Sequence, residues 1–484
     1  MIKKLLREPL FYLLPLLAIV YLMIIPAHLE ISGRIGPPSG FKALSLMHYI
    51  FALLFLLSVA LILRKVKFKF IAISIILLGI IIRLILYAYS DPMLNVHDID
   101  THFYYMQVIA EEKRLPKIGE YRNTNHPPLY YIASAAIKSI SDRYAPNLTN
   151  RILQQFSLLL SFSCIIFGVA FLINSFGNNR AAYSAALIFV FWPGFILTAP
   201  RINNDILFYF GALFCMLFAQ RYWCSRKNFD VVFASIGASI ALAAKSTGFV
   251  ILGVWVMIYA LNALRFLKIN SLRTLFASMS IIILSVVLSN YRIIADILED
   301  GKKPVLADVR NSHWLDALKV QNTVGNYLYF DLQDYLLEPY TSPWEDKGGR
   351  QYFWNFALKT SLFGEFRLWD MPVGRIFAAI LSILALLIWI FALWGMMHFQ
   401  VKELPSLFFI GFLFAALIFL RVSYPYACSN DFRYIMPVLL PLSCFAIRGI
   451  QILQNLRLRI LAGGGIVLFA GLSFLFMFLR GFYV

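Results

Sequence analysis

Long apolar runs separated by short polar or basic stretches dominate the pattern of this chain. Two of them are PLFYLLPLLAIVYLMIIPA at residues 9–27 and FIAISIILLGIIIRLILYAYS at residues 70–90. Such runs have about the 20 residues that an α-helix needs to cross a bilayer. The first is too long for the core of a signal peptide, so we expect an uncleaved anchor. Together the runs predict an all-α polytopic membrane protein with about 13 transmembrane helices.

One apolar stretch is too short for a crossing. HPPLYYIASAAIKSI, residues 126–140, has an apolar run of about 14 residues, which favours an interfacial or re-entrant helix. If this helix does not cross, the basic loops RKVKFK, RYWCSRK, RFLKINSLR and QNLRLR all fall on one side of the membrane. Because Lys and Arg mark the cytoplasmic side, the N-terminus is predicted to be cytoplasmic. The loop that precedes and contains this helix then lies on the opposite side.

The same pattern divides the chain into three regions. Residues 1–290 form a predicted transmembrane catalytic module, whose outer loop at residues 90–150 holds an amphipathic helix and the re-entrant helix. Residues 291–372 are mostly polar, and we expect them to form an extracytoplasmic segment. Residues 373–484 return to apolar runs and are predicted to be C-terminal transmembrane helices.

Composition agrees with this class and narrows the chemistry. Hydrophobic residues make up 60% of the 484 positions and charged residues 14%, and the mean hydropathy is +0.74. Lys and Arg in cytoplasmic loops explain the net charge of +18, so we expect no nucleic-acid partner. The five cysteines form no disulfide framework. The sequence has no Walker motif, no GxGxxG after a strand, no CxxC and no HExxH, which argues against nucleotide hydrolysis, a bound dinucleotide and a zincin site.

Charged residues at the predicted outer ends of the helices are the candidates for function. An ionisable group at the membrane boundary is costly unless it is paired, solvated or used. A carboxylate there can accept a proton from a nucleophile, and cations can stabilise a phosphate leaving group. The candidate residues at this face are Asp98, Asp100, Arg201, Asp205, Lys245 and Arg433.

The residues of the first outer loop carry a family resemblance. HDIDTHFYYMQVIAEEKRLP at residues 97–116, followed by NHPPLYY, resembles the first outer loop of the C-type (GT-C) integral-membrane glycosyltransferases. This superfamily includes the protein O-mannosyltransferases and the aminoarabinose transferase of lipid A. Weaker matches follow in the family's order: Arg151, RINNDILF, AAKSTGF, KTSLFGEF and FRYIMPVLLP. The resemblance covers most of residues 70–450.

This resemblance implies a fold of many transmembrane helices, a polyprenyl-phosphate-sugar donor and inversion at the anomeric carbon. Asp98 takes the place of the family's catalytic Asp, the base that deprotonates the acceptor, and His102 matches the family His. Ile99 stands where the family usually has Glu, and an acid follows at Asp100. Either carboxylate is therefore a candidate base, and we favour Asp98.

Roles for the remaining residues follow from the resemblance and from residue chemistry. We expect catalytic roles for Asp98, Asp100 and Asp205, donor-phosphate binding by Arg201, Lys245 and Arg433, and substrate contacts by His102, His126, Tyr105 and Tyr130. The structural alternatives are a helix cap for Asp205, headgroup contacts for the cations and interfacial positions for the tyrosines. His102 could instead pair with Asp98 or cap the amphipathic helix, and His126 could simply end a loop before the two prolines. A divalent cation, Mg²⁺ or Mn²⁺, on Asp98, Asp100 and Asp205 is compatible with their oxygen ligands.

Together these features predict a glycosyltransferase of the bacterial inner membrane that acts on the periplasmic face. Its partners would be a polyprenyl-phosphate-sugar donor, an acceptor that is a glycan, lipid A or a protein, and the lipid bilayer. The alternative functions are a lipid-linked-glycan flippase or transporter and an O-antigen polymerase or ligase. A transporter would distribute charge through the membrane midplane, whereas these charges gather at one face.

Overall fold

The computed structural model describes residues 68–93, 97–122, 124–266, 272–300, 313–345 and 348–480. The first two predicted transmembrane helices lie outside these ranges. Within them the regular structure is helical, and β-pairing is limited to an isolated bridge between Lys319 and Tyr426. The prediction of an all-α membrane protein is confirmed for the described residues.

Nine helical segments of the described residues are long and apolar enough to cross a membrane. Their α-helices are α4 (Phe70–Tyr89), α7 (Thr149–Phe176), α10 (Asp205–Ser225), α12 (Gly248–Phe266), α13 (Leu272–Asp300), α18 (Pro372–Met397), α19 (Leu404–Ser423), α20 (Leu439–Ile452) and α21 (Leu456–Arg480). Two shorter apolar helices, α8 (Arg180–Val190) and α11 (Asn228–Ala244), match two further predicted transmembrane helices.

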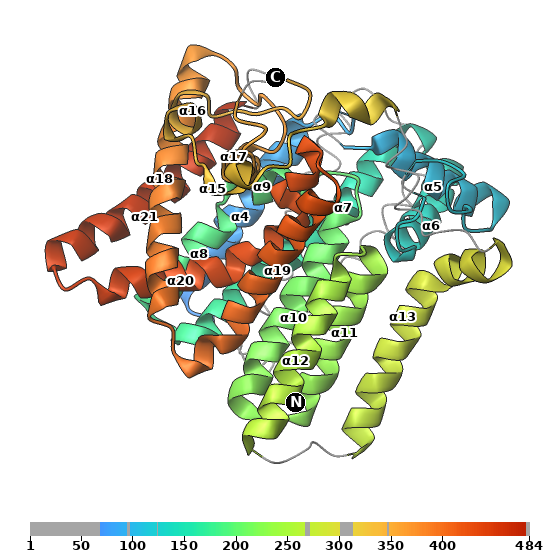
Figure 1. Cartoon of the computed structure of the whole chain (residues 1–484), viewed down its shortest axis with the longest axis horizontal. Helices are drawn as coiled ribbons and strands as arrows, with labels where there is room; N and C mark the ends of the chain where they lie inside the picture. Colours follow the sequence, from blue (N-terminus) through green and yellow to red (C-terminus); the bar gives the residue numbers. More distant parts are fainter. Residues whose placement is uncertain are drawn as a thin grey trace.

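Long helices form the body of the molecule, and short helices gather at one end of it (Figure 1). In the body, α10 packs against α7 and α11, α11 against α13, and α18 against α20. Gly211 on α10 and Gly237 on α11 lie against the backbone of the other helix, so a Cβ at either would collide with it. Small residues of this kind let two helices approach closely inside a membrane.

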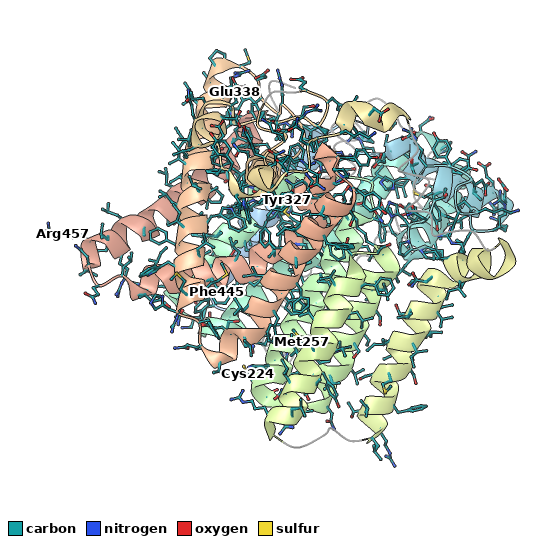
Figure 2. The ribbon with its side chains drawn as sticks, viewed as in Figure 1. Cys224, Met257, Tyr327, Glu338, Phe445 and Arg457 are labelled. Carbon is teal, nitrogen blue, oxygen red and sulfur yellow. The ribbon has the colours of Figure 1, made fainter. Side chains whose placement is uncertain are left out.

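The short helices at the end of the body come from three parts of the sequence. They are α5 (Ile99–Glu112), α6 (Leu129–Tyr144), η1 (Pro146–Leu148), η2 (His313–Leu318), α15 (Val324–Leu328), α16 (Leu332–Leu337) and α17 (Phe353–Phe363). Three short 3-10 turns lie next to α19 and α20. They are η3 (Val401–Glu403) before α19, and η4 (Ala427–Asn430) and η5 (Phe432–Val438) between α19 and α20. Figure 2 shows Glu338 at this end and Cys224 at the opposite end of the molecule.

The helix predicted over 181–200 is broken. It ends at Val190, and a separate turn, α9 (Pro193–Leu197), follows. The break lies at Trp192, whose backbone is extended with ψ of 120°, directly before Pro193. A residue before proline is disfavoured in the helical region, and proline lacks the N–H that an interior helical position needs. The irregular backbone is buried in protein, with all of α9 inaccessible.

The segment 291–372 differs from the expected polar loop at both ends. Helix α13 continues to Asp300, which lengthens the preceding helix. Helix α17 is almost entirely buried, and it packs against α9. Trp192 donates a hydrogen bond from Nε1 to the carbonyl of Ser361 at 2.7 Å, which ties α9 to α17. Part of this segment therefore belongs to the protein core, and this burial brings its C-terminal end next to Arg201.

Candidate functional site

The turn before α5 presents the Asp98 carboxylate without using it to cap the helix. Asp98 is the N-cap residue in the left-handed region, with φ of 50° and ψ of 32°, and its side chain makes no capping hydrogen bond. Its carbonyl accepts the backbone N–H of His102 at 3.1 Å, which fixes the start of the helix. Asp is one of the few residues that tolerate this backbone conformation. Asp98 is exposed.

Asp100 turns toward a different set of partners. Its Oδ2 accepts a hydrogen bond from the hydroxyl of Tyr121 at 3.0 Å and pairs with Arg122. Slight burial acts to raise its pKa, but the bond from Tyr121 and the charge of Arg122 lower that pKa overall. About half of the side chain is exposed, at 47%. Asp100 therefore takes part in a surface network that holds the loop after α5.

Aromatic packing accounts for much of the first outer loop. Tyr105 stacks on Tyr131 with ring centroids 3.9 Å apart, and His102 Nδ1 lies 3.0 Å from the Tyr131 hydroxyl. Tyr130 meets Tyr131 edge to face. The rings of Tyr105 and Tyr130 are fully buried, so the structure places both in the core rather than on an open surface. Burial lowers the pKa of His102 to about 4, which keeps it neutral at physiological pH.

Arg292 of α13 holds the segment that carries His126. Its guanidinium donates to the carbonyls of Pro116 at 2.7 Å, Thr124 at 3.0 Å and His126 at 2.8 Å. The Tyr105 hydroxyl donates to the same His126 carbonyl at 3.1 Å. Burial, together with the charge of Lys245, lowers the pKa of His126 to about 3. Arg292 thus positions the loop by backbone contacts, a role that its place in the sequence does not indicate.

Asp205 and Lys245 form a buried ion pair where α10 begins and α11 ends. Lys245 Nζ contacts Asp205 Oδ1, and both residues are more than nine-tenths buried. The ammonium also lies 4.4 Å from the centre of the Tyr434 ring. Asn204 donates to the carbonyl of Ala244 at 2.9 Å, which joins the ends of the two helices. The structure therefore brings together two predicted site residues that lie far apart in sequence.

Arg201 and Arg433 supply two further cations beside this pair. The Arg201 guanidinium lies 4.9 Å from the centre of the Phe366 ring, and its Nη2 is buried without a hydrogen-bond partner in the part of the chain that the structure describes. Burial lowers the pKa of Arg201 to about 10, so it remains charged at neutral pH. Arg433 Nε lies 3.1 Å from Asp431 Oδ2. The positive charge of Arg433 adds to the effect of burial in lowering the pKa of Arg201 and of Lys245.

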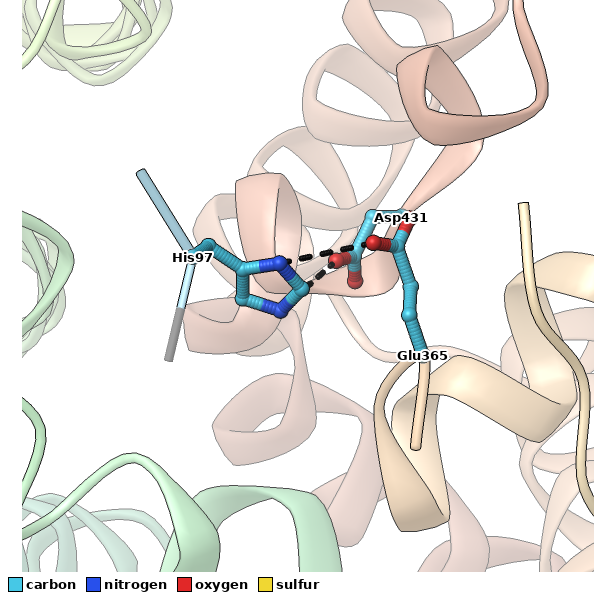
Figure 3. Close-up of side chains that lie close together, drawn as sticks. All are labelled: His97, Glu365 and Asp431. Atoms are coloured by element: carbon cyan, nitrogen blue, oxygen red, sulfur yellow. Dashed lines mark ion pairs between the residues drawn. The ribbon is translucent and has the colours of Figure 1, made fainter. Parts of the chain in front are cut away.

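Three residues that the sequence did not single out complete the arrangement (Figure 3). His97 Nδ1 lies 3.4 Å from Glu365 Oε2, and its Nε2 lies 3.9 Å from Asp431 Oδ2. Burial, then the nearby Asp431 and Asp98, raise the pKa of Glu365 well above its usual range, despite Arg433 and Arg201. Burial and the neighbouring cations hold the pKa of His97 well below its usual value. The His97–Glu365 contact therefore joins two neutral groups rather than two ions.

These residues define what we call the buried cluster: His97, Arg201, Asp205, Lys245, Glu365, Asp431 and Arg433. Asp98 is exposed and lies beside the cluster, since its negative charge acts to raise the pKa of Glu365 and of His126. The cluster draws on the loop before α5, the turn between α9 and α10, the ends of α11 and α17, and η5. Its charges can hold an anion and accept a proton from a bound group.

A weak signal for the missed residues is present in the sequence. His97 directly precedes Asp98, Glu365 ends the KTSLFGE stretch, and Asp431 stands two positions before Arg433. Each is a neighbour of a residue or stretch already considered, but nothing local indicates that the three meet. Among the described residues, His97, Glu365 and Asp431 form a group of His and carboxylate side chains that could hold a metal ion. The predicted trio of Asp98, Asp100 and Asp205 does not form such a group.

A second concentration of charge lies between α16, α17 and α18. This outer cavity has a volume of about 450 Å³, and its charged lining residues are Asp331, Asp334, Glu338, Glu345, Arg367 and Arg375. Five of these six residues form ion pairs: Asp334 with the buried Lys359 at 2.7 Å, Glu345 with Arg367 at 2.5 Å, and Glu338 with Arg375 at 3.6 Å.

Comparison of the chain with protein-family models and with curated proteins gives no match. The resemblance of the first outer loop to the C-type glycosyltransferases therefore stays a prediction from its residues.

Proposed function

We propose that this protein is a polyprenyl-phosphate-dependent glycosyltransferase whose active site is the buried cluster together with Asp98. One observation carries the proposal. Three cations from distant parts of the sequence, Arg201, Lys245 and Arg433, converge at one place, and the exposed Asp98, which does not cap its own helix, acts on the neighbouring Glu365 and His126. Fixed cations suit a phosphate leaving group, and a free carboxylate suits deprotonation of an acceptor.

The cations would bind the phosphate of the donor. Arg201 has a buried Nη2 without a hydrogen-bond partner, which a phosphate oxygen would satisfy. Arg433 and Lys245 are compensated by Asp431 and Asp205, so these carboxylates keep the cations in place before the donor binds. The polyprenyl chain would lie in the bilayer beside the apolar helices.

Asp98 would act as the general base. The acceptor oxygen attacks the anomeric carbon and its proton passes to the Asp98 carboxylate, while the bond from that carbon to the phosphate oxygen breaks. The electron pair of this bond remains on the phosphate, where the three cations stabilise it. A single displacement of this kind inverts the anomeric configuration. The left-handed backbone at Asp98 supports this role, since it holds the carboxylate away from the helix N-terminus.

The test is a transfer reaction with the purified full-length protein. Undecaprenyl-phosphate sugars carrying a hexose, a pentose or an amino sugar are incubated with the protein and with lipid A, envelope glycans or envelope proteins. Mass spectrometry should detect one sugar mass added to one acceptor class. Wild-type protein that transfers none of these sugars would contradict the proposal. Movement of an unmodified lipid-linked glycan across proteoliposomes would support the transporter alternative.

The orientation has its own test. In the proposed arrangement the buried cluster faces the periplasm of a bacterial inner membrane. Single cysteines introduced near residues 120 and 325 should then react with a membrane-impermeant thiol reagent in intact spheroplasts. A cysteine near residue 226 should react only after the membrane is opened. Labelling of the last position in intact cells would place the site on the cytoplasmic side.

A further inference from the structure

His97, Glu365 and Asp431 carry an inference that goes beyond sugar transfer. We propose that these three side chains bind one divalent metal ion of the Mn²⁺ type within the buried cluster. The inference concerns residues other than the predicted trio of Asp98, Asp100 and Asp205. It does not depend on the proposed function, because metal binding can be measured without a sugar donor.

The distances between the ligand atoms suit a common ion. One nitrogen of His97 and one carboxylate oxygen from each acid lie within 4.8 Å of one another. Two atoms bound to the same ion at about 2.1 Å lie no more than roughly 4.2 Å apart. With Nε2 of His97 as the ligand atom, its distance of 3.9 Å to Asp431 Oδ2 meets that limit, whereas the 3.4 Å contact with Glu365 is made by the other ring nitrogen, Nδ1. Small side-chain rotations would bring all three atoms onto one ion.

Polar atoms in this cluster are buried without the hydrogen bonds they need. Among the described residues, His97 Nε2 and Glu365 Oε1 are inaccessible and have no hydrogen-bond partner, and the equally inaccessible Asp431 Oδ2 has only the ion-pair contact with Arg433 Nε at 3.1 Å. The three side chains are only 10%, 7% and 1% exposed. Leaving a buried polar group unsatisfied costs about 1–3 kcal/mol each, and more when the group is charged. Figure 3 shows the imidazole directed at both carboxylates, so one cation between them would satisfy all three.

The backbone around each ligand is held independently of any ion. Gly364, with φ of 65°, turns the chain at the end of α17 so that Glu365 points back into the cluster. Asp431 uses Oδ1 to cap η5, accepting the Arg433 N–H at 2.9 Å, which leaves Oδ2 for another partner. Asn430 donates to the Phe353 carbonyl at 2.6 Å and fixes this turn to α17. Ligands held in this way need little reorganisation to bind a metal ion.

The ligand types favour a particular class of ion. Two carboxylates suit Mg²⁺, Ca²⁺ and Mn²⁺, whereas an imidazole suits transition metals such as Mn²⁺ and Zn²⁺ better than Mg²⁺. A set of one imidazole and two carboxylates also leaves coordination positions open, as in catalytic rather than structural sites. The cluster therefore selects for Mn²⁺ or Zn²⁺ over Mg²⁺. With the proposed function, an open position would take a phosphate oxygen of the donor.

Arg433 is the competitor for this site. Its Nε lies 3.1 Å from Asp431 Oδ2, the oxygen that the ion would use. Either the guanidinium or the metal ion neutralises this carboxylate. Glu365, which is neutral without the ion, releases its proton when the ion binds, and the resulting carboxylate and Asp98 compensate the added cation. Replacement of Arg433 by Gln should therefore preserve or strengthen metal binding, although the same change weakens binding of a phosphate.

Metal binding is measured by titrating MnCl₂ into the purified full-length protein and following free Mn²⁺ by electron paramagnetic resonance. We expect about one ion bound per chain and an increase in Tm on binding. His97→Gln and Glu365→Gln should each weaken binding by about tenfold or more. The matched controls are His398→Gln and Glu112→Gln, which remove an exposed imidazole and an exposed carboxylate elsewhere. Both controls should bind Mn²⁺ as the wild type does.

Two results would overturn the metal site. One is that the wild-type protein shows no saturable binding of Mn²⁺, a result that can be interpreted without any variant. The other is a bound Mn²⁺ that shows no imidazole-nitrogen coupling in pulsed spectra, or that His97→Gln and Glu365→Gln retain at full affinity. Mn²⁺ binding without sugar transfer would contradict the proposed function alone. Sugar transfer by a protein that binds no Mn²⁺ would contradict the metal site alone.

Discussion

The buried cluster and the outer cavity carry similar numbers of charged groups but differ in how those charges are satisfied. In the outer cavity, Glu345 and Arg367 pair with side chains that are 47% and 45% exposed. In the buried cluster, Asp431 and Arg433 pair at 1% and 12% exposure, while inaccessible atoms of His97, Arg201 and Glu365 have no hydrogen-bond partner among the described residues. Exposed ion pairs contribute little to the free energy of unfolding, whereas buried polar groups without a partner destabilise the folded protein. The comparison favours the buried cluster over the outer cavity as the place where a ligand binds.

The largest expected effect is on chemistry at the accessible side of the cluster. Asp98→Asn keeps the shape and tolerates the left-handed backbone, but it removes the proton acceptor. Turnover should fall by about 10² to 10⁴ while donor affinity stays nearly unchanged. Asp100→Asn is the matched control, because Asp100 binds Tyr121 and Arg122 at the surface. Both variants are assayed for turnover and donor affinity at equal protein concentration.

The opposite ranking would reassign the base. If Asp98→Asn keeps near-native turnover and Asp100→Asn is inactive, Asp100 is the base, and the loop rearranges on binding the substrate. If both variants remain fully active, the proposed mechanism is wrong.

A smaller effect is expected on donor affinity. Arg433→Gln removes one cation from the cluster and should weaken binding of the donor by about 1–3 kcal/mol, the value of one charge-assisted hydrogen bond. Arg367→Gln removes an equally charged side chain from the outer cavity and should leave donor affinity unchanged. Donor dissociation constants for both variants test the comparison directly. Equal losses would show that general positive charge, rather than the cluster, attracts the donor.

The pH dependence of stability gives a third contrast. Burial holds the pKa of His102 at about 4, below its ordinary value of 6.5. As pH falls below 6.5, the unfolded chain takes up a proton before the folded protein does. The free energy of unfolding should therefore decrease between about pH 6.5 and pH 4, by no more than about 1.4 kcal/mol per pH unit for this residue. It should not change for this reason above pH 6.5.

His102→Phe should remove that part of the slope. The difference is measured by thermal unfolding of both proteins in detergent from about pH 4 to about pH 8. This range covers both the shifted and the ordinary pKa of the histidine. A variant with the wild-type slope would show that His102 takes up its proton equally in the folded and unfolded states.

The smallest effect is expected in the outer cavity. Glu345 and Arg367 form a half-exposed ion pair at 2.5 Å. Replacing both by Gln should change the free energy of unfolding by only about 0.2–1 kcal/mol. A double-mutant cycle on Tm, with each single variant, isolates the coupling between the two side chains. A coupling of several kcal/mol would mean that this cavity is as tightly organised as the buried cluster.

Much of the fold could be predicted from the sequence, because a long apolar run has few alternatives to a membrane helix. The helix over 70–90 and the start of an amphipathic helix after Asp98 are examples, since each depends on local pattern alone. The break at Trp192 was missed because the apolar run continues through Pro193. The burial of α17 was missed because its neighbours, α9 and η5, lie far away in the sequence.

For the candidate site, too, some features could be predicted from the sequence and others could not. Asp205 and Lys245 were proposed separately from their positions at helix ends, and the structure joins them as an ion pair. Tyr105 and Tyr130 were proposed to contact substrate because tyrosines gather in the first loop; that role stays a prediction, and the structure packs both rings in the core. Glu365 carries only a weak local signal, as the last residue of the KTSLFGE stretch. Its place in the cluster depends on the glycine turn and on burial of α17, which only the folded chain reveals.

The broken helix before Arg201 also bears on how the protein is made. Helix α8 has 11 residues, and at 1.5 Å per residue it is roughly 16 Å long, about half of the bilayer core. It cannot complete a crossing by itself, and the irregular chain after it has polar backbone groups that lipid cannot satisfy. Ser361 of α17, which binds Trp192, is synthesised 169 residues later. Insertion of this segment therefore cannot finish during its own translation, and the site assembles only after most of the chain has left the ribosome.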